Sequence, residues 1–226
     1  MDTQRDLIEG LLQFVTLTEG ERKLLAADLH DQTLSDLRQT ARVARKLLDL
    51  PSYTMSTEVR RGLELIVATL DATMNEIRRA MENLSPSALD TLGFLPAIES
   101  CIEHTAQTCD PRLVPRFASY VKEEQVKLSD IEKLMLYRIV QEALNNIAKH
   151  ALASQVEVLI IKIGDELLIR VVDDGRGITT SADLRMSRGI ENMRYRARLI
   201  GAHLTWLRAT GQKGTVVEVR MPMSSP

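Results

Sequence analysis

The chain has 226 residues, of which 44% are hydrophobic and only 4% aromatic, and its formal net charge is −2. That length suits one large domain or two modest ones. A weakly acidic chain without a basic stripe is not expected to bind nucleic acid directly. Its two cysteines are too few for a disulfide framework and form no zinc-binding spacing. No apolar run approaches the roughly 20 residues that a membrane span needs, so we expect a cytoplasmic chain that makes no membrane contact of its own.

The first 86 residues are expected to form a helical hairpin. The first helix is predicted from about residue 4 to 49, just before Pro51, and the second ends at Ser85-Pro86. Apolar side chains recur on both helices at sums of three- and four-residue steps. On the first helix they are Leu25, Leu29, Leu37, Ala41, Ala44 and Leu48, and on the second they are Val59, Leu63, Ile66, Leu70, Met74, Ile77, Met81 and Leu84.

Such a hairpin leaves one apolar stripe exposed. A second copy of the chain would bury the stripe in a four-helix bundle. We therefore expect residues 1–86 to form a homodimer, and packing of the stripe against the rest of the same chain is the alternative.

The remaining residues mix helices and strands. Helices are predicted over 94–108, 129–150 and 189–201, with Ser129 as the cap of the second, and a strand is predicted over 116–123. The segments QVEVLIIKIG and ELLIRVVDD indicate two strands joined by a hairpin at Gly164-Asp165. HLTWLRA and GTVVEVRMP indicate two more strands around GQKG. Because hairpins join the strands, an α+β domain is favoured over a doubly wound sheet.

The segment DLHDQ places His30 beside Asp31 on the first helix. A neutral imidazole carries a free lone pair and is a good nucleophile near neutral pH. A neighbouring carboxylate can fix the ring tautomer or accept the ring proton. By itself, however, a solvated helix surface explains this segment more simply.

A second polar segment, VQEALNNIAKH, lies on the helix predicted over 129–150. Glu142 and Asn146 recur there at helical spacing, and their oxygens are ligands that magnesium prefers. Lys149 and His150 follow at the helix end, where cationic groups suit phosphates. Alone, this segment is an ordinary amphipathic helix with a polar face.

Three glycine-containing segments follow. In VVDDGRGI, a strand ends at Asp173, whose carboxylate suits an exocyclic amine, and Gly175 and Gly177 allow a sharp turn and a close approach to a ligand. The triplet SRG at 187–189 opens a helix whose N-terminal amides suit phosphate. The turn GQKGT would bring Thr215 near the same site. Each of these segments is commonly just a turn when it stands alone.

The order of these segments resembles the two-component sensor histidine kinases of the NarX and DesK-like subfamily. ERKLLAADLHD is similar to that family's phosphoacceptor box, and NEIRRAMENLSPSALDTLGFLPAI to its second-helix and linker segment. LYRIVQEALNNIAKHA resembles its N box, DDGRGI its first glycine box, and SRGIENMRYRARLIGAHL with GQKGTVVEVRMP the rest of its nucleotide site. The resemblance covers about residues 18 to 222. It implies a dimerisation and histidine-phosphotransfer domain over 1–86, followed over 87–226 by a catalytic α/β-sandwich ATP-binding domain of the GHKL (Bergerat) type.

The resemblance implies a protein-histidine kinase that uses ATP and Mg²⁺. It implies His30 as the phosphoacceptor, Asp31 as its acid/base, Glu142 in catalysis, and Asn146 with Glu142 at the metal. The partners that it implies are a second copy of the chain and the receiver domain of a response regulator joined to a helix-turn-helix output domain. It is also compatible with the cytoplasmic part of a membrane-anchored sensor. The implied nucleotide-binding residues are Asn146, Lys149, His150, Asp173, Gly175, Gly177, Ile178, Arg188, Gly189, Met193 and Thr215, and the loop between Gly177 and Gly189 matches a short ATP lid.

One position departs from the subfamily pattern. The Gln that usually follows the Asp by four residues is Ser35 here, and Gln32 lies on another face of the helix. That Gln is held to orient the water that dephosphorylates the partner, so we expect autokinase activity to survive and phosphatase activity to be weak. Two alternatives stay open, because a fold alone does not fix a function. One is another ATPase of the same fold, which would not phosphorylate its own histidine, and the other is a non-catalytic dimeric scaffold.

Overall fold

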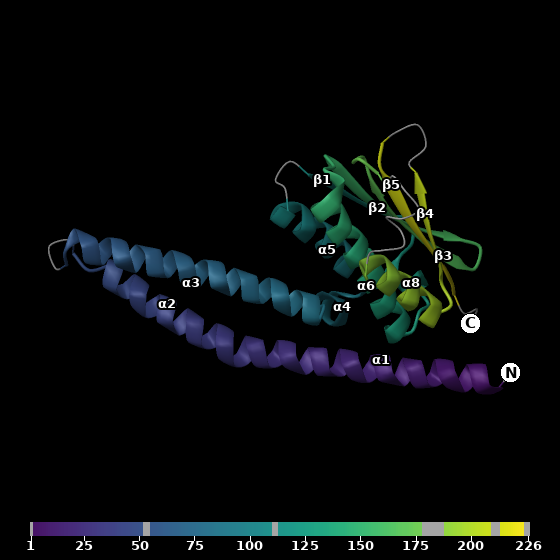
Figure 1. Ribbon diagram of the computed structural model, residues 1–226, viewed down its shortest axis with the longest axis horizontal. Coiled ribbons are helices and arrows are strands. Elements are labelled where there is room, and N and C mark those ends of the chain that lie inside the picture. Colours follow the sequence, from purple (N-terminus) through teal and green to yellow (C-terminus); the bar gives the residue numbers. More distant parts are fainter. Residues whose placement is uncertain (1, 52–54, 110–112, 178–187, 209–212, 224–226) are drawn as a thin grey trace. The chain divides into compact units, whose positions relative to one another are not determined.

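A computed structural model describes residues 2–51, 55–109, 113–177, 188–208 and 213–223. The chain divides into two compact units, Met1–Ser87 and Ala88–Pro226 (Figure 1). The first unit is helical and the second combines helices with a mixed sheet, which confirms the predicted α+β class. Within the described ranges, no helix is long and apolar enough to span a bilayer.

The first unit is a hairpin of two long helical arms. The first arm consists of α1 (Asp2–Asp28), η1 (Leu29–Thr33) and α2 (Leu34–Leu48), which follow one another with right-handed helical backbone angles at both junctions. The second arm is α3 (Thr57–Leu84), which returns alongside α2 (Figure 1). The Ser56 side chain accepts a hydrogen bond from a backbone N–H in the first turn of α3 at 3.3 Å, so α3 begins with an N-cap.

A narrow apolar seam holds α2 against α3. Its buried members are Leu34, Ala41 and Met74, and Leu37, Leu70, Ile77 and Met81 pack partly buried around them. Upstream of η1, Ala26 is 8% exposed and Leu25 is 55% exposed. The π-helical turn η1 changes the phase of the helix between these residues and α2. The place of Leu25 on a stripe that a second copy would cover stays a prediction.

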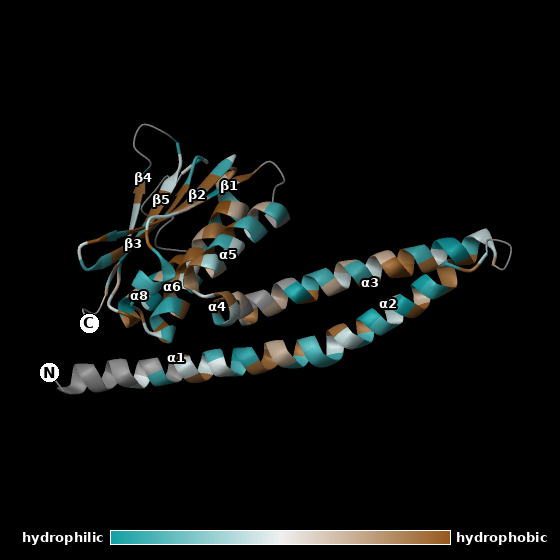
Figure 2. Cartoon of the chain, turned by 180° about the vertical axis from the view of Figure 1, so that it is seen from behind, coloured by the Kyte–Doolittle hydropathy of each residue, from teal (hydrophilic) through white to brown (hydrophobic). Residues whose placement is uncertain are grey.

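Other apolar side chains of the hairpin lie outside this seam. Figure 2 shows hydrophobic residues recurring along both α2 and α3. The exposed large ones include Val43, Leu47, Val59, Leu65 and Ile66. A single hairpin therefore leaves an apolar face uncovered.

The described residues of the second unit form a five-stranded sheet in the order β1-β2-β3-β5-β4. The strands are β1 (Val114–Ser119), β2 (Gln155–Ile163), β3 (Glu166–Asp173), β4 (His203–Arg208) and β5 (Thr215–Pro222). β1 pairs parallel with β2, and the other neighbours are antiparallel. The predicted hairpin at Gly164-Asp165 is confirmed, with Gly164 at a φ of 59°.

The helices α5 (Phe94–Cys109), α6 (Asp130–Asn146) and α8 (Arg188–Leu199) cover one face of this sheet (Figure 1). The shorter elements α4 (Ser87–Leu92), η3 (Glu123–Gln125) and η4 (Ile147–Ala151) connect them along the chain. α6 is the central helix of the core, where Leu136, Ile139 and Leu144 are fully buried.

The start of α6 confirms the cap predicted at Ser129. The Ser129 side chain accepts from the Glu132 N–H, and the Glu132 carboxylate accepts from the Ser129 N–H at 2.7 Å. This capping box fixes where α6 begins. The C-terminal half of α6 carries Glu142 and Asn146, which are half-buried and belong to the candidate site.

Candidate functional site

In the helical unit, His30 and Asp31 lie on η1 with side chains 55% and 79% exposed. His30 Nδ1 is 3.0 Å from Asp31 Oδ1. When the ring proton is on Nδ1, it is donated to this carboxylate, and Nε2 keeps a free lone pair. The pair is thus an accessible imidazole beside a carboxylate that can fix its tautomer, which suits a nucleophilic histidine.

The turn that carries this pair is π-helical, which the periodicity of the sequence did not predict. The Leu34 N–H donates to the Leu29 carbonyl, five residues back instead of four. Single π-turns inside α-helices are rare and occur frequently at functional sites.

In the second unit, the polar end of α6 meets the start of α8. Glu142 and Asn146 are half-buried on α6, and Lys149 and His150 are exposed on η4. A side chain at Gly189 would run into the Glu142 carboxylate, so α8 approaches α6 closely at this point. The structure therefore brings Glu142 and Gly189 together, as the resemblance implies.

Asp173 ends β3 with a buried carboxylate that is only 4% exposed. Its two oxygens accept from the Gly175 N–H at 2.8 Å and the Thr215 N–H at 3.2 Å. Burial raises the pKa of Asp173, although both hydrogen bonds act against the rise. A buried acceptor with lone pairs to spare is suited to a ligand that donates an N–H.

The next residue, Asp174, has a structural role. Its carboxylate accepts from the Ser154 N–H at 2.8 Å, the Ser154 hydroxyl at 2.6 Å and the Gln155 N–H at 2.8 Å. Partial burial opposes its ionisation, but these hydrogen bonds outweigh the burial and lower the pKa of Asp174. The two neighbouring carboxylates therefore differ, because the donors to Asp174 come from Ser154 and from Gln155, the first residue of β2.

Two glycines after Asp173 let the turn pack closely. A Cβ at Gly175 would collide with the Ala151 carbonyl, which accepts the Arg176 N–H at 2.8 Å. Gly177 has a φ of 73°, and a Cβ there would lie 3.0 Å from the Gly214 carbonyl. This turn is therefore clamped between η4 and the start of β5.

Gly214 is a residue that the sequence reasoning did not assign to the site. It has a φ of 132°, and a Cβ there would run into the Asp173 carbonyl. The GQKGT turn did mark the region, but the close approach of Gly214 depends on the pairing of β3 with β5.

The other predicted nucleotide-binding residues differ in their exposure. Arg188 is exposed as the first residue of α8, whereas Met193 is 1% exposed and belongs to the hydrophobic core. Thr215 reaches Asp173 through its backbone N–H. Ile178 and the rest of the predicted lid up to residue 187 lie outside the described residues.

Comparison with known proteins agrees with this arrangement. Residues 131–225 match the family described as "Histidine kinase-, DNA gyrase B-, and HSP90-like ATPase". The chain is 25% identical over 224 residues to "Signal transduction histidine-protein kinase/phosphatase DegS" from Brevibacillus brevis, which covers 95% of this chain and 54% of that protein. The chain thus spans about half the length of this curated relative.

Solved structures show the same fold. The histidine kinase domain of the Erythrobacter litoralis EL346 blue-light activated histidine kinase superposes with a TM-score of 0.55 at 15% identity, over 84% of this chain and 94% of that one. A second structure of that kinase gives 0.54 at 16% identity, over 86% of this chain and 60% of that one. The ATPase family thus matches most of the second unit, and the similarity to the DegS histidine kinase extends through the helical unit as well.

Proposed function

We propose that this chain is the kinase core of a two-component system, which uses ATP to phosphorylate His30 and passes the phosphoryl group to an aspartate of a response regulator. The observation that carries the proposal is the exposed His30–Asp31 pair, held at 3.0 Å, in a chain that also contains an ATPase domain. The name of the DegS relative, a kinase/phosphatase, supports the same chemistry.

The transfer requires few protein groups. Nε2 of His30 attacks the γ-phosphorus of ATP, the bond from that phosphorus to the bridging oxygen breaks, and ADP leaves. Asp31 accepts the hydrogen bond from Nδ1 and stabilises the positive charge that the ring gains. The phosphohistidine then yields its phosphoryl group to a receiver carboxylate, and His30 is regenerated. Such transfers depend mainly on positioning and charge neutralisation.

The second unit fits a nucleotide. The Asp173 carboxylate suits the exocyclic amine of adenine, because it is buried and accepts N–H donors already. Gly175 and Gly177 let backbone approach a ligand without side chains in between. Lys149, His150 and Arg188 supply cationic or polarisable groups for the phosphates. Met193, also implied by the resemblance, is buried in the core and would support the site through packing.

The same unit offers two oxygen donors for Mg²⁺. The described residues contain no cluster of three or more His, Cys, Asp and Glu side chains. Asn146 and Glu142 would therefore share the ion with phosphate oxygens and water, as Mg²⁺ commonly does at nucleotide sites. The ion would neutralise charge on the phosphates during transfer.

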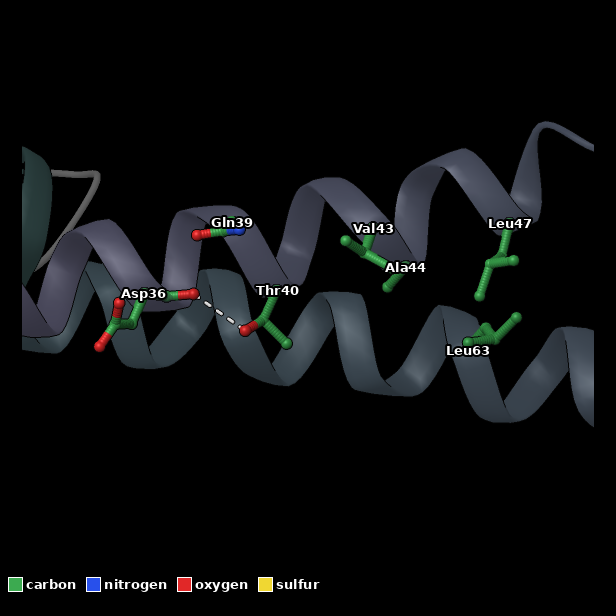
Figure 3. Close-up of a pocket in the computed structure, with 7 residues that line it drawn as sticks. All are labelled: Asp36, Gln39, Thr40, Val43, Ala44, Leu47 and Leu63. Atoms are coloured by element: carbon green, nitrogen blue, oxygen red, sulfur yellow. Dashed lines mark hydrogen bonds between the residues drawn. The ribbon is translucent and has the colours of Figure 1, made fainter.

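The helical unit supports a homodimer through residues 1–86. A groove of about 560 Å³ opens between α2 and α3, lined by Val43, Ala44 and Leu47 of α2 and Leu63 of α3 (Figure 3). Asp36, Gln39 and Thr40 continue it with polar groups, and Thr40 donates to the Asp36 carbonyl of its own helix. A second hairpin would cover these apolar side chains and complete a four-helix bundle.

The partner would be the receiver domain of a response regulator, joined to a helix-turn-helix output domain. Its phosphorylated aspartate is the product of the second transfer, and we place the reaction in the cytoplasm. That partner, and not this chain, would bind nucleic acid.

Dephosphorylation of the partner should be slow. Ser35 is exposed on α2 and has no amide to orient a water. We predict that Ser35→Gln raises the rate of phosphate release from the phosphorylated regulator on the order of tenfold, because water positioning is the missing contribution. Ser35→Asn, whose amide is one methylene shorter, is the matched control. An unchanged rate in Ser35→Gln would contradict this explanation.

The decisive experiment is incubation of the purified chain with Mg²⁺ and γ-labelled ATP. We expect acid-labile, alkali-stable label on the parent and none on His30→Gln. His203→Gln is the matched control, because it removes an exposed histidine of β4 that is given no role in the site. Label retained in His30→Gln would refute His30 as the acceptor. ATP binding or hydrolysis without any label on the parent would favour a plain ATPase or a non-catalytic scaffold.

A further inference from the structure

The seam between α2 and α3 has a regular spacing. Its α2 members Leu34, Leu37 and Ala41 follow one another by steps of three and four residues, and the same steps continue to Ala44 and Leu48. A further step of four residues toward the N-terminus reaches His30. In an uninterrupted α-helix, therefore, His30 would continue this seam and face the interior of the hairpin.

The structure does not follow that path. From Leu34 the buried side of the helix passes in one step of five residues to the half-buried Leu29 and then to Ala26, which is 8% exposed. The five-residue step coincides with the hydrogen bond from the Leu34 N–H to the Leu29 carbonyl. Two seams that differ by one residue in register therefore meet at η1, and the π-turn accommodates the extra residue.

We propose that this π-turn lets the upstream seam run through Leu29 and Ala26, and that this register keeps His30 off the helix seam and in solvent. Leu29 and Ala26 are then positioning residues, because their burial holds the upstream seam one residue away from the register of α2. The way in which His30 is exposed does not depend on its chemistry. Only the role of the exposed imidazole as phosphoacceptor rests on the proposed function.

The alternative register is well defined. An α-helix turns by about 100° per residue, so loss of the π-turn would rotate α1 by about 100° relative to α2. Ala27 and His30 would then replace Ala26 and Leu29 on the seam. Burying the polar imidazole without a partner opposes that register, whereas burial of Leu29 favours the observed one.

The test moves the upstream seam by one residue. In the double variant Ala26→Glu/Ala27→Leu, the new leucine at position 27 lies where an uninterrupted helix would place a seam residue. The new glutamate at position 26 puts a charge on the present seam position. We expect His30 to react with diethyl pyrocarbonate at least tenfold more slowly than in the parent, as located by peptide mass spectrometry, with helix content unchanged by circular dichroism. In the control Ala27→Glu, which charges only an exposed position, the rate should stay within twofold of the parent.

Deletion of Gln32 provides an independent test. The deletion removes the extra residue, so that Leu34 follows Leu29 by four positions. The seam of α2 and the upstream seam through Leu29 and Ala26 then continue in one regular α-helix. His30 lies beside this seam and not on it. We expect His30 in this variant to react within twofold of the parent. Full reactivity in a folded Ala26→Glu/Ala27→Leu protein, or protection of His30 in the deletion, would overturn the proposal. Because this measurement needs no ATP, its outcome is separate from success or failure of the kinase assay.

Discussion

Asparagine at position 173 would test how the second unit recognises adenine. The Asp173 carboxylate is 4% exposed and accepts two backbone N–H groups, from Gly175 and Thr215. Its remaining lone pairs are the buried acceptors that we assign to the exocyclic amine. Asparagine keeps the shape of the side chain but replaces one acceptor oxygen with an NH₂ group, which must face one of these three donors.

The expected loss follows from the charge of the acceptor. A hydrogen bond to a charged group contributes about 1.5–3 kcal/mol, which corresponds to about a tenfold to hundredfold change in Kd. We expect Asp173→Asn to weaken ATP by that factor in isothermal titration calorimetry. Inosine triphosphate has a carbonyl in place of the exocyclic amine. We expect it to bind the variant at least as tightly as it binds the parent, because the new NH₂ group can donate to that carbonyl.

The two nucleotides separate recognition from structural damage. Removal of a buried charge offsets part of the lost hydrogen bonding, since burial raises the pKa of Asp173 and so disfavours its ionised form. Because the NH₂ group takes the place of an oxygen that accepts a backbone N–H, we expect the free energy of unfolding to fall by about 1–3 kcal/mol in the absence of nucleotide. Equal weakening of ATP and inosine triphosphate, or unchanged ATP binding, would refute the assignment of Asp173 to the adenine amine.

Three further predictions concern the stability of the second unit, whose unfolding the single tryptophan on β4 reports by fluorescence. Gly175→Ala should lower the free energy of unfolding by about 2–4 kcal/mol, because the new methyl group collides with a backbone carbonyl of η4; a loss under 1 kcal/mol would contradict this packing. Leu152→Asn should raise it by about 1 kcal/mol, because Leu152 is 91% exposed and has a left-handed φ of 52° that asparagine tolerates; no gain would show that the leucine is not strained. Burial opposes ionisation of Glu218, but the hydrogen bonds and charges of Arg220 and Arg170 outweigh burial and lower the pKa of Glu218. The ionised Glu218 therefore stabilises the fold fully above the usual glutamate pKa of about 4.3. This stabilisation is lost as the pH falls through the lowered pKa. Glu218→Gln should therefore flatten the acid limb of the stability profile, and an unchanged limb would exclude this ion pair as its cause.

Local rules predicted the elements, because their signals lie within a few neighbouring residues. The step of three and four residues marked both helices of the hairpin, and Gly164-Asp165 marked the turn between β2 and β3. The π-turn at η1 was not predicted, because the periodicity was taken to indicate one uninterrupted helix. Its signal is the five-residue step from Leu29 to Leu34, which has meaning only once burial is known.

The site was less predictable because its contacts are distant in sequence. Asp173 and the Thr215 N–H are 42 residues apart, and their contact follows from the register that pairs Val172 with Val216. The same register brings Gly214 against the Asp173 backbone. The residue types could be read from the sequence, but their neighbours required the sheet.

Two of the segments that the sequence marked for chemistry, DLHDQ and VQEALNNIAKH, contain a π-turn. η1 carries His30, and η4 carries Lys149 and His150 before Leu152 reverses the chain. In each case a regular α-helix would satisfy the local propensity of the sequence but would turn the polar side chains to other directions. At η4 the irregular end also places the Ala151 carbonyl where it accepts the Arg176 N–H, so the end of α6 is fixed to the turn after Asp173. A helix is expected to depart from regular α-helical geometry where function constrains the directions of its side chains. The π-turns at η1 and η4 therefore support a chemical role for these two segments, and this support does not depend on motif resemblance.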